Sequence, residues 1–555
     1  EPGVPRSLEP YADETLLDVF ARSAREDPEH PTLLFKGAPL RAAELARLSD
    51  AFARFLVARG IGRGDRVATL LPNCPQAVIA MLGAWKAGAV LVPLNPLYAE
   101  EELRKPLAAT GVRAIVVLTP FYERVKRVQA STRLTTIVAA NIKEHLPPLL
   151  RILFTLLKER REGHRVRLRD GDLSFPETLR APGAGAPAPA RPDDTAFILL
   201  SGGTTGTPKG VLVPHRGLSI TARQLRAWVG RFMVMREDRI LLPLPLFHAF
   251  GCIATLGQSL IGRNPLILVP NPRDLGDVVA TIRRDRPAFF VGVPTLYNAL
   301  LNHAAVRSGR ADFRSMKLCF SSAAPLLLET HRRFETLTGG RLVEGYSLTE
   351  AGIAAVITPL AHPGKPGSVG TPLPDVDLRI VDAESGEREL PRGEVGEVLL
   401  RAPQIMPGYL DDPEETAVAL RRHDEGPPWL HTGDLGYLDE DGFLFLVDRK
   451  KDLIKISGLQ VWPREIEEAV AEHPKVAEVA VAGVPDPARG EVAKAWVVLR
   501  EGQRLTLEEL REHCKGRLAP FKAPALLEVR RDLPKSMVGK VLRRVLVAEH
   551  RASVS

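Results

Sequence analysis

Cysteine is scarce in this sequence, and long apolar runs are missing. The four cysteines among 555 residues, Cys74, Cys252, Cys319 and Cys514, stand far apart and form no C-x-x-C pair. This spacing argues against a disulfide framework or a zinc site and indicates the reduced thiols of a cytoplasmic protein. No stretch approaches the roughly 20 uninterrupted apolar residues of a membrane span. The first residues have neither the basic nor the apolar region of a secretory signal.

A strong charge of one sign is also missing. Lysine and arginine total 75 against 67 aspartates and glutamates, so the net charge of +8 is spread over a large surface. No basic run is interleaved with aromatic residues, and no nucleic-acid module is recognisable, so we expect no nucleic-acid partner. A weak positive field suits anionic small substrates and an anionic membrane surface equally well.

The order of apolar segments predicts an α/β fold in two parts. Strand patterns at residues 66–71 and 89–93 enclose a helical pattern at 75–87, which is typical of a parallel sheet. Residues 367–447 are glycine-rich and alternating, which indicates antiparallel strands. Five consecutive charges at 448–452 precede a tail of about 100 residues with its own α and β patterns. We therefore predict a large domain at 1–448, with parallel-type sheets, helices and an antiparallel portion, and a small α+β domain at 449–555.

The strongest local motif is SGGTTGTPKG at residues 201–210, directly after a short apolar run at 195–200. Its glycines let backbone N–H groups approach an anion, its threonine hydroxyls add donors, and Lys209 adds a positive charge. It is not a Walker A loop, because Gly210 follows Lys209 where that loop has Ser or Thr. The pattern predicts phosphate binding by Ser201, Gly203, Thr204, Thr205, Gly206, Thr207 and Lys209.

This loop resembles the phosphate-binding signature of the adenylate-forming superfamily, which includes acyl-CoA synthetases, coumarate–CoA ligases, luciferases and peptide-synthetase adenylation domains. Five further segments resemble the superfamily's other signatures and occur in the expected order. They are SSAAP at 321–325, EGYSLTE at 344–350, HTGD at 431–434, DRKKDLIK at 448–455 and PKSMVGK at 534–540. Six ordered motifs cover nearly the whole chain.

The resemblance assigns a role to each motif. It implies that the tail is a mobile domain, that Lys540 is catalytic, that Glu350 and Ser201 hold Mg²⁺, and that Gly458 borders the coenzyme A channel. It further implies an ATP site made of the loop residues together with Ala323, Ala324, Glu344, Gly345, Tyr346, Thr349, Asp434, Arg449, Lys451 and Lys455. Outside their motifs, Lys540 and Glu350 would be interpreted as solvated surface groups.

Two apolar segments are candidates for the acid-binding side. PLFHAFG at 245–251 carries His248 between aromatic residues and resembles the family's wall between acyl pocket and thiol tunnel, so His248 is a second candidate catalytic residue. A further segment, beginning at residue 292, supplies Gly292, Val293 and Pro294 as candidate acyl-binding residues. A core histidine and plain core packing are the alternatives.

Residues 143–169 form an unusual insertion. Two prolines at 147–148 open an apolar helical pattern through 157, and arginines follow at 160, 161, 165, 167 and 169. A wide apolar face beside basic residues suits the interface of an anionic membrane. The alternatives are a helix packed on its own domain and a seam with a homodimer partner. The insertion resembles one in bacterial long-chain fatty acid–CoA ligases.

Together these features predict an ATP-dependent fatty acid–CoA ligase. The enzyme would join a long-chain fatty acid to AMP, then pass the acyl group to coenzyme A, with Mg²⁺ as its cofactor. It would be cytoplasmic or peripheral on the inner face of the membrane. The alternatives are a ligase for medium-chain or aryl acids, a ligase that loads a carrier protein, and a non-catalytic lipid- or nucleotide-binding protein.

Overall fold

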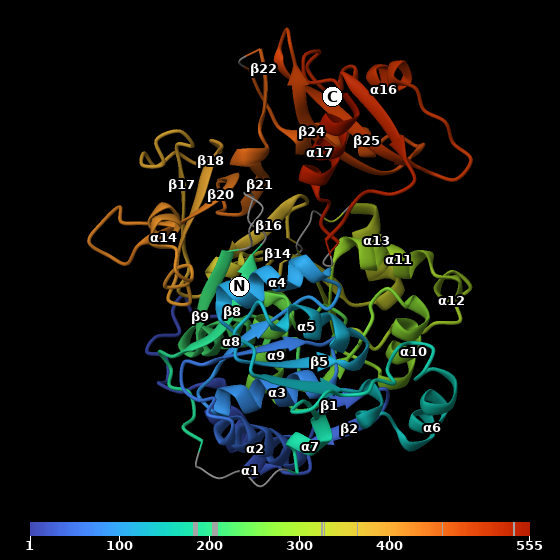
Figure 1. Cartoon of the computed structure of the whole chain (residues 1–555). Helices are drawn as coiled ribbons and strands as arrows, with labels where there is room; N and C mark the ends of the chain where they lie inside the picture. The colour runs from blue at the N-terminus through green and yellow to red at the C-terminus, as the bar shows by residue number, and fades with distance from the viewer. Residues whose placement is uncertain are drawn as a thin grey trace. The chain divides into compact units, whose positions relative to one another are not determined.

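A computed structural model describes residues 1–180, 187–201, 209–322, 326, 328–353, 355–362, 364–457, 459–536 and 539–554 (Figure 1). The chain divides into two compact units. The first comprises Glu1–Gly364, Pro372–Asp377 and Arg401–Arg421, and the second comprises Lys365–Thr371, Leu378–Leu400 and Arg422–Ser555. The predicted boundary at residue 448 falls inside the second unit and remains a proposal.

A seven-stranded sheet forms the first layer of the first unit. Its order is β7-β6-β5-β3-β4-β8-β9, with strands β3 (Arg66–Leu70), β4 (Val90–Pro93), β5 (Ala114–Leu118), β6 (Thr136–Ala140), β7 (Leu173–Ser174), β8 (Thr195–Ser201) and β9 (Lys209–Pro214). The strands from β7 to β8 pair in parallel, as the sequence predicted, and β9 closes the sheet as an antiparallel hairpin with β8. Alternate strand residues such as Val92 and Val117 pack against Leu103 and Tyr122 of the helices that follow the strands.

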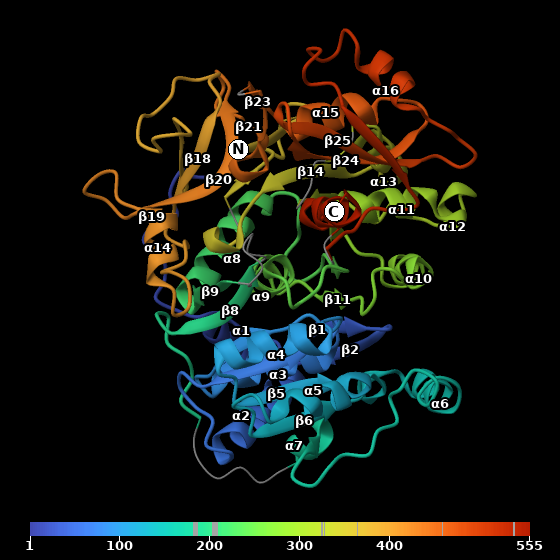
Figure 2. The same ribbon diagram turned by 45° about the horizontal axis from the view of Figure 1, so that its top comes forward.

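A second sheet of the first unit carries the order β2-β1-β11-β10-β12-β13-β14-β15. In Figure 2 its first two strands, β1 and β2, are blue, whereas its later strand β14 is yellow. Its strands are β1 (Pro31–Phe35), β2 (Ala38–Arg41), β10 (Ile240–Leu242), β11 (Leu266–Leu268), β12 (Phe289–Gly292), β13 (Leu318–Ser321), β14 (Arg341–Tyr346) and β15 (Val356–Ile357). The pairs from β1 through β11, β10, β12 and β13 to β14 are parallel, so their carboxyl ends share one edge.

Helices surround these sheets. They are α1 (Leu16–Glu26), α2 (Ala42–Ala58), α3 (Pro75–Lys86), α4 (Glu100–Thr110), α5 (Tyr122–Gln129), α6 (Pro148–Leu157), α7 (Phe175–Thr178), α8 (His215–Val229), α9 (Leu256–Gly262), α10 (Leu275–Asp285), α11 (Pro294–Asn302), α12 (Ala304–Arg307), α13 (Leu328–Thr338) and α14 (Pro413–Ala419). Short turns of 3₁₀ helix are η1 (Thr119–Phe121), η2 (Ile142–His145), η4 (Thr349–Ala351) and, in the second unit, η5 (Lys450–Asp452), and η3 (Phe250–Thr255) is a π-helix.

Helix α6 differs from the other long helices because it buries none of its residues within the described chain. It lies outside the sheet and helix layers of its unit in both views (Figures 1 and 2). Among the described residues of the helix only Phe154 is half-buried, and its ring contacts the His164 ring of the same domain, so the alternative of a helix packed on its own domain stays a prediction. The helix is too short to span a bilayer, and no other helix among the described residues is long and apolar enough to cross a membrane.

The second unit begins with an antiparallel sheet, as the pattern at 367–447 predicted. Its strands are β16 (Ser368–Pro372), β17 (Asp377–Val381), β18 (Gly396–Arg401), β20 (Trp429–Leu438) and β21 (Leu444–Arg449), whereas the short strand β19 (Leu420–Arg421) belongs to the first unit. The pairs β16–β21, β18–β20 and β20–β21 are antiparallel.

The tail of the second unit is an α+β body, in agreement with the sequence. Its sheet contains β22 (Ile454–Ile456), β23 (Leu459–Val461), β24 (Val476–Asp486), β25 (Gly490–Leu499) and β26 (Leu526–Arg530). Strand β25 sends Ala495 into a core with α15 (Pro463–Ala471) and α16 (Leu507–Cys514), and Trp496 into a second core with α17 (Arg543–Val554). This alternation gives the sheet an apolar core on each face.

Candidate active site

The carboxyl ends of three parallel strands form the base of the site in the first unit. Gly292 of β12 pairs with Ser321 of β13, and Ser321 pairs with Glu344 of β14. Three of the predicted motifs, far apart in the chain, therefore meet at one edge of the sheet. Open α/β sheets bind their ligands at this edge, because the loops that follow the strands gather there.

Two glycines at this edge are required by close packing. A Cβ atom at Gly345 would lie 2.4 Å from the Phe320 ring, and one at Gly292 would lie 2.9 Å from the Tyr297 ring. The Tyr297 hydroxyl donates to the carbonyl oxygen of Phe320 at 2.8 Å, which ties α11 to β13. These contacts hold the strand that carries Tyr346, a predicted adenine-binding residue that is buried.

The phosphate motif starts and ends on a hairpin. Ser201 is the last residue of β8 and pairs with Lys209, the first residue of β9. Both ends of the predicted loop are therefore fixed by the sheet. Several predicted site residues lie outside the described residues, and their roles remain predictions. They are Gly203, Thr204, Thr205, Gly206, Thr207, Ala323, Ala324 and Gly458.

A chain of polar contacts joins the phosphate motif to the predicted metal ligand. Lys209 forms an ion pair with Glu415, and its ammonium lies 5.2 Å from the centre of the Tyr409 ring. The Tyr409 hydroxyl in turn donates to Oε1 of Glu350 at 3.1 Å. Burial and the Glu350 carboxylate raise the pKa of Tyr409 well above its usual range, so the hydroxyl keeps its proton.

Sequence reasoning missed Tyr409 and Glu415. The segment that carries them is held in place by backbone hydrogen bonds, from Leu410 N to the Gly210 carbonyl at 2.7 Å and from Met406 N to the Glu350 carbonyl at 2.9 Å. It thus binds both the β9 strand and the Thr349–Ala351 turn. No local pattern marks it, because its role depends on these contacts across the fold.

His248 lies two residues before the π-helix η3. Its Nδ1 accepts a hydrogen bond from Phe250 N at 3.3 Å, which leaves the proton on Nε2. Desolvation by burial lowers the pKa of His248 to about 4, so the ring is neutral near pH 7. The following turn needs Gly251, where a Cβ atom would lie 2.3 Å from the Pro245 carbonyl oxygen. His248 is therefore a neutral hydrogen-bond donor and not a cation.

An apolar cavity of about 40 Å³ lies beside this strand edge. Its wall includes Phe250 and Phe320, which stack with ring centres 5.4 Å apart, and it reaches Tyr346 and Ser347. On β12 the lining residues are Phe289 and Val291. The predicted acyl-binding residues Gly292, Val293 and Pro294 do not line the cavity, and their acyl role stays a prediction.

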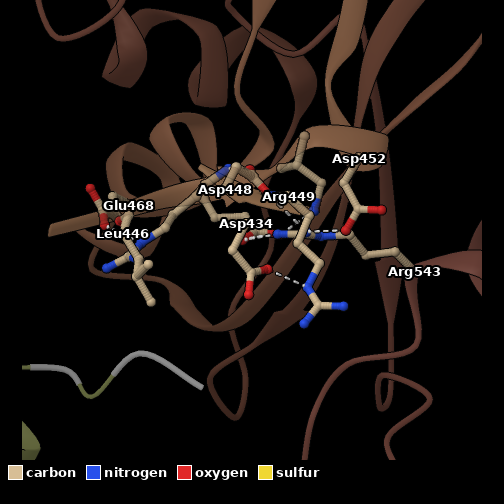
Figure 3. Close-up of polar contacts among 10 residues, drawn as sticks. Asp434, Leu446, Asp448, Arg449, Asp452, Glu468 and Arg543 are labelled. Atoms are coloured by element: carbon tan, nitrogen blue, oxygen red, sulfur yellow. Dashed lines mark hydrogen bonds and ion pairs between the residues drawn. The ribbon is translucent and has the colours of Figure 1, made fainter. Parts of the chain in front are cut away.

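In the second unit, Asp434 and Arg449 face each other across β20 and β21. They are register partners, and Nε of Arg449 donates to Oδ1 of Asp434 at 2.8 Å (Figure 3). Asp434 is buried. A carboxylate has about four lone-pair sites, so Asp434 can accept hydrogen bonds from hydroxyl groups of a ligand in addition to the one from Arg449.

The charge run at 448–452 is held by two arginines that sequence reasoning also missed. Arg543 donates to Asp448 at 3.3 Å and to Asp452 at 3.1 Å (Figure 3), and it pairs with Glu467 at 2.8 Å. Arg464 donates its backbone N–H to Asp448 at 2.9 Å. Asp448 and Asp452 of this segment are therefore tied to other elements of the second unit, whereas Lys450 and Lys451 are exposed.

Lys540 follows Gly539, whose φ of 74° places it in the left-handed region that glycine favours. Desolvation, and then the positive charges of Arg449 and Lys451, lower the pKa of Lys540 to about 8, while Asp434 acts in the opposite direction. Because the residue as a whole is exposed, solvent screens part of this effect. The second unit therefore brings together four predicted residues, Lys540, Asp434, Arg449 and Lys451. Lys455 lies on β22 with its side chain exposed.

Comparison with known proteins agrees with these motifs. The family model for AMP-binding enzymes matches residues 20–410, and the model for the AMP-binding enzyme C-terminal domain matches residues 465–540. The chain is 37% identical to a long-chain-fatty-acid–CoA ligase of Bacillus subtilis (strain 168), over 98% of this chain and 96% of the relative. It is 36% identical to the ligase of the same name from Yersinia pestis, with the same coverage.

A solved structure gives the same result for the fold. The crystal structure of ATP-bound MatB from Rhodopseudomonas palustris superposes with a TM-score of 0.82, at 30% identity, and covers 97% of this chain and all of that chain. The chain therefore belongs to the family of AMP-binding enzymes, the adenylate-forming ligases that its ordered motifs predicted.

Proposed function

We propose that the protein is an ATP-dependent ligase that joins long-chain fatty acids to coenzyme A. The observation that carries this proposal is the 37% identity, over 98% of this chain, with a long-chain-fatty-acid–CoA ligase. The apolar cavity supports the proposal, because it reaches Tyr346 and Ser347 beside the predicted nucleotide residues. An alkyl chain suits its wall, because that wall is made almost entirely of aromatic and aliphatic side chains.

The reaction has two steps. A carboxylate oxygen of the fatty acid attacks the α-phosphorus of ATP, the bond to the bridging oxygen breaks, and pyrophosphate leaves with the electron pair. The sulfur of coenzyme A then attacks the acyl carbonyl carbon, AMP leaves, and the thiol proton passes to solvent. Both steps develop negative charge on oxygen atoms, so positioned cations and donors lower both barriers.

Each candidate residue has a role in this proposal. Lys540 and Lys209 supply positive charge to the phosphates, Asp434 accepts hydrogen bonds from the ribose hydroxyls, and His248 donates from Nε2 to an oxygen of the reacting acyl group. The ammonium of Lys540 keeps its proton below a pH of about 8. Burial of Asp434 strengthens its hydrogen bonds to the ribose, because bulk water does not compete for it.

Mg²⁺ fits the donors that are available. The described residues contain no group of three metal-ligating side chains. Mg²⁺ in nucleotide enzymes is held through one or two protein oxygens, substrate phosphates and waters, so Glu350 with the Ser201 hydroxyl is a sufficient protein contribution. The ion would neutralise phosphate charge. Tyr409 keeps the Glu350 carboxylate oriented for it through the 3.1 Å hydrogen bond.

The alternatives differ in the acid and the acceptor. A medium-chain or aryl acid would replace the long-chain acid in both steps, and a carrier protein would replace coenzyme A without changing the first step. A pyrophosphate-release assay over a series of acid chain lengths, with and without coenzyme A, separates these cases. We expect the highest kcat/KM for long chains and thioester formation only with coenzyme A. Pyrophosphate release only with short or aryl acids would contradict the proposed long-chain substrate. No pyrophosphate release with any acid would favour a non-catalytic binding protein.

We further propose that α6 attaches the protein to the inner face of a membrane. Six aliphatic side chains of this helix are at least two-fifths exposed, namely Leu149, Leu150, Ile152, Leu153, Leu156 and Leu157. Exposed Arg160, Arg165 and Arg167 follow it and provide charge complementary to anionic lipids. Phe154 is the exception on the helix, because its ring packs edge-on against His164 at 5.1 Å and faces the protein.

Replacing Leu156 and Leu157 by glutamate tests the attachment, because these side chains are 75% and 68% exposed. Each buried leucine contributes roughly 1.5–3 kcal/mol, so binding to phosphatidylglycerol vesicles should fall about hundredfold or more with the melting temperature unchanged. Leu97→Glu, at a 52% exposed site outside α6, is the matched control. A lower melting temperature, or a change from dimer to monomer in sedimentation, would instead identify α6 as a seam with a second copy.

A further inference from the structure

One polar side chain in the wall of the apolar cavity has no partner. Gln258 of α9 lines the cavity and is 2% exposed. Among the residues that the structure describes, neither its Oε1 nor its Nε2 atom has a hydrogen-bond partner. A buried carboxamide without partners is costly, and most buried polar groups in proteins are paired. The unpartnered amide therefore points to a ligand that supplies a partner.

Two other polar groups of the wall have partners of their own. The Thr255 hydroxyl donates to the carbonyl oxygen of Phe250 at 3.0 Å, and Nε1 of Trp228 donates to the carbonyl oxygen of Thr358 at 3.3 Å. A water molecule in a buried site needs two to four polar partners to be held. Here it would find little besides Gln258, because the surrounding wall is aromatic and aliphatic. Water is therefore a poor substitute for a ligand group at this position.

Gln258 lies away from the end of the cavity where chemistry is proposed. Phe250, the first residue of the π-helix η3, stacks on Phe320. Phe320 is one residue before the carboxyl end of β13, so this helix starts near the end of the cavity where the reaction is proposed. Phe250, Ala254 and Gln258 recur at helical spacing along the wall, and Gln258 is about two turns beyond Phe250. A group bonded to Gln258 therefore belongs to the body of the acyl chain and not to the carboxylate.

We propose that Gln258 determines specificity by binding a hydroxyl group carried on the acyl chain of the substrate. This inference rests on the proposed function and names the substrate class more narrowly. A hydroxyl both donates and accepts a hydrogen bond, so it satisfies Oε1 and Nε2 together, whereas a ketone or ether only accepts. A plain alkyl chain in the same place leaves the amide unpaired. The cavity should therefore select a long-chain acid with a hydroxyl at one depth.

The test uses palmitic acid and monohydroxypalmitic acids with the hydroxyl moved carbon by carbon from mid-chain to the methyl end. The ratio of kcat/KM for each hydroxy acid to that for palmitic acid is measured by pyrophosphate release. We expect a maximum of this ratio at one hydroxyl position. In Gln258→Met the ratio at that position should fall about tenfold or more, because the hydroxyl then enters an apolar wall without a partner. A ratio that is flat over all positions, or unchanged by Gln258→Met, would overturn the proposal.

Two controls keep the result interpretable. Thr255→Val changes another lining residue whose hydroxyl is already paired within its helix, so it should affect both acids alike. Thermal shift of the wild-type protein by each acid, without ATP or coenzyme A, should show the same positional maximum and does not depend on a folded variant. If palmitic acid supports no pyrophosphate release but the maximum in thermal shift is present, the proposed function fails while the role of Gln258 stands. Equal thermal shifts at all positions would contradict the role of Gln258.

Discussion

The two units each present a lysine from a predicted motif, but the two ammonium groups differ in their surroundings. Lys209 in the first unit is paired with Glu415 and lies over the Tyr409 ring. Lys540 in the second unit lies among cations as well as acids, and its pKa is lowered to about 8. A lysine that is already paired with a carboxylate adds little net positive charge at a bound phosphate. A lysine that lies near other cations is destabilised by them, and a bound phosphate would stabilise its charge. The comparison assigns most of the electrostatic catalysis to Lys540.

The largest expected effect is the loss of Lys540. Lys540→Ala should lower the rate of acyl-adenylate formation by several powers of ten, because a cation aimed at the transition state is removed. Lys209→Ala should cost only about tenfold to hundredfold, because Glu415 already neutralises that charge. Pyrophosphate exchange without coenzyme A measures both. ATP binding and thioester formation from pre-formed acyl-AMP should stay within a few-fold in Lys540→Ala, and equal losses in the two variants would contradict the comparison.

The second prediction is a pH dependence that belongs to Lys540 alone. Its pKa is lowered, so the ammonium is present below a pH of about 8 and is lost as the pH rises through this value. The kcat/KM for ATP in pyrophosphate exchange should therefore fall above that pH by about tenfold per unit. Lys540→Arg should remove this decline at a lower overall rate, because a guanidinium group does not deprotonate in this range. Lys209→Arg should leave the decline in place, and a decline that persists in Lys540→Arg would assign the titration to another group.

The sequence predicted the elements and the motifs of the site better than the contacts between motifs. Periodicity located the β3–α3–β4 unit within one or two residues, because each element there is buried and therefore strongly patterned. It did not find Tyr409, Glu415, Arg464 or Arg543. Their partners are distant in sequence, and an isolated tyrosine or arginine carries no pattern of its own. The predicted helix at 149–157 is present, but only the fold shows that its aliphatic side chains are exposed and that Phe154 packs on His164.

A smaller effect is expected at Asp434, which lies near Lys540 in the second unit. Asp434→Ala removes a charged acceptor for the ribose hydroxyls and should weaken ATP binding by about tenfold to hundredfold, with little change in the affinity for fatty acid. The same change leaves Arg449 without its partner, so Asp434→Asn is the matched control, since it keeps one acceptor oxygen beside Arg449. Calorimetric titration with a non-hydrolysable ATP analogue measures the affinity. A larger loss for the fatty acid than for ATP would contradict the ribose role.

The smallest expected effect concerns Tyr409, the residue that links the paired lysine to the proposed metal ligand. Tyr409→Phe keeps the ring beneath Lys209 and removes only the hydroxyl that donates to Glu350 at 3.1 Å. One hydrogen bond contributes about 0.5–1.5 kcal/mol, so the Mg²⁺ concentration for half-maximal pyrophosphate exchange should rise by a few-fold to about tenfold. Glu350→Gln should raise it further, because a charged oxygen ligand is lost. In the double variant the Tyr409 change should add nothing, since its partner is already gone. Full additivity of the two changes would show that Tyr409 acts on Lys209 or on the phosphates directly. Lys209 of the first unit would then contribute to catalysis.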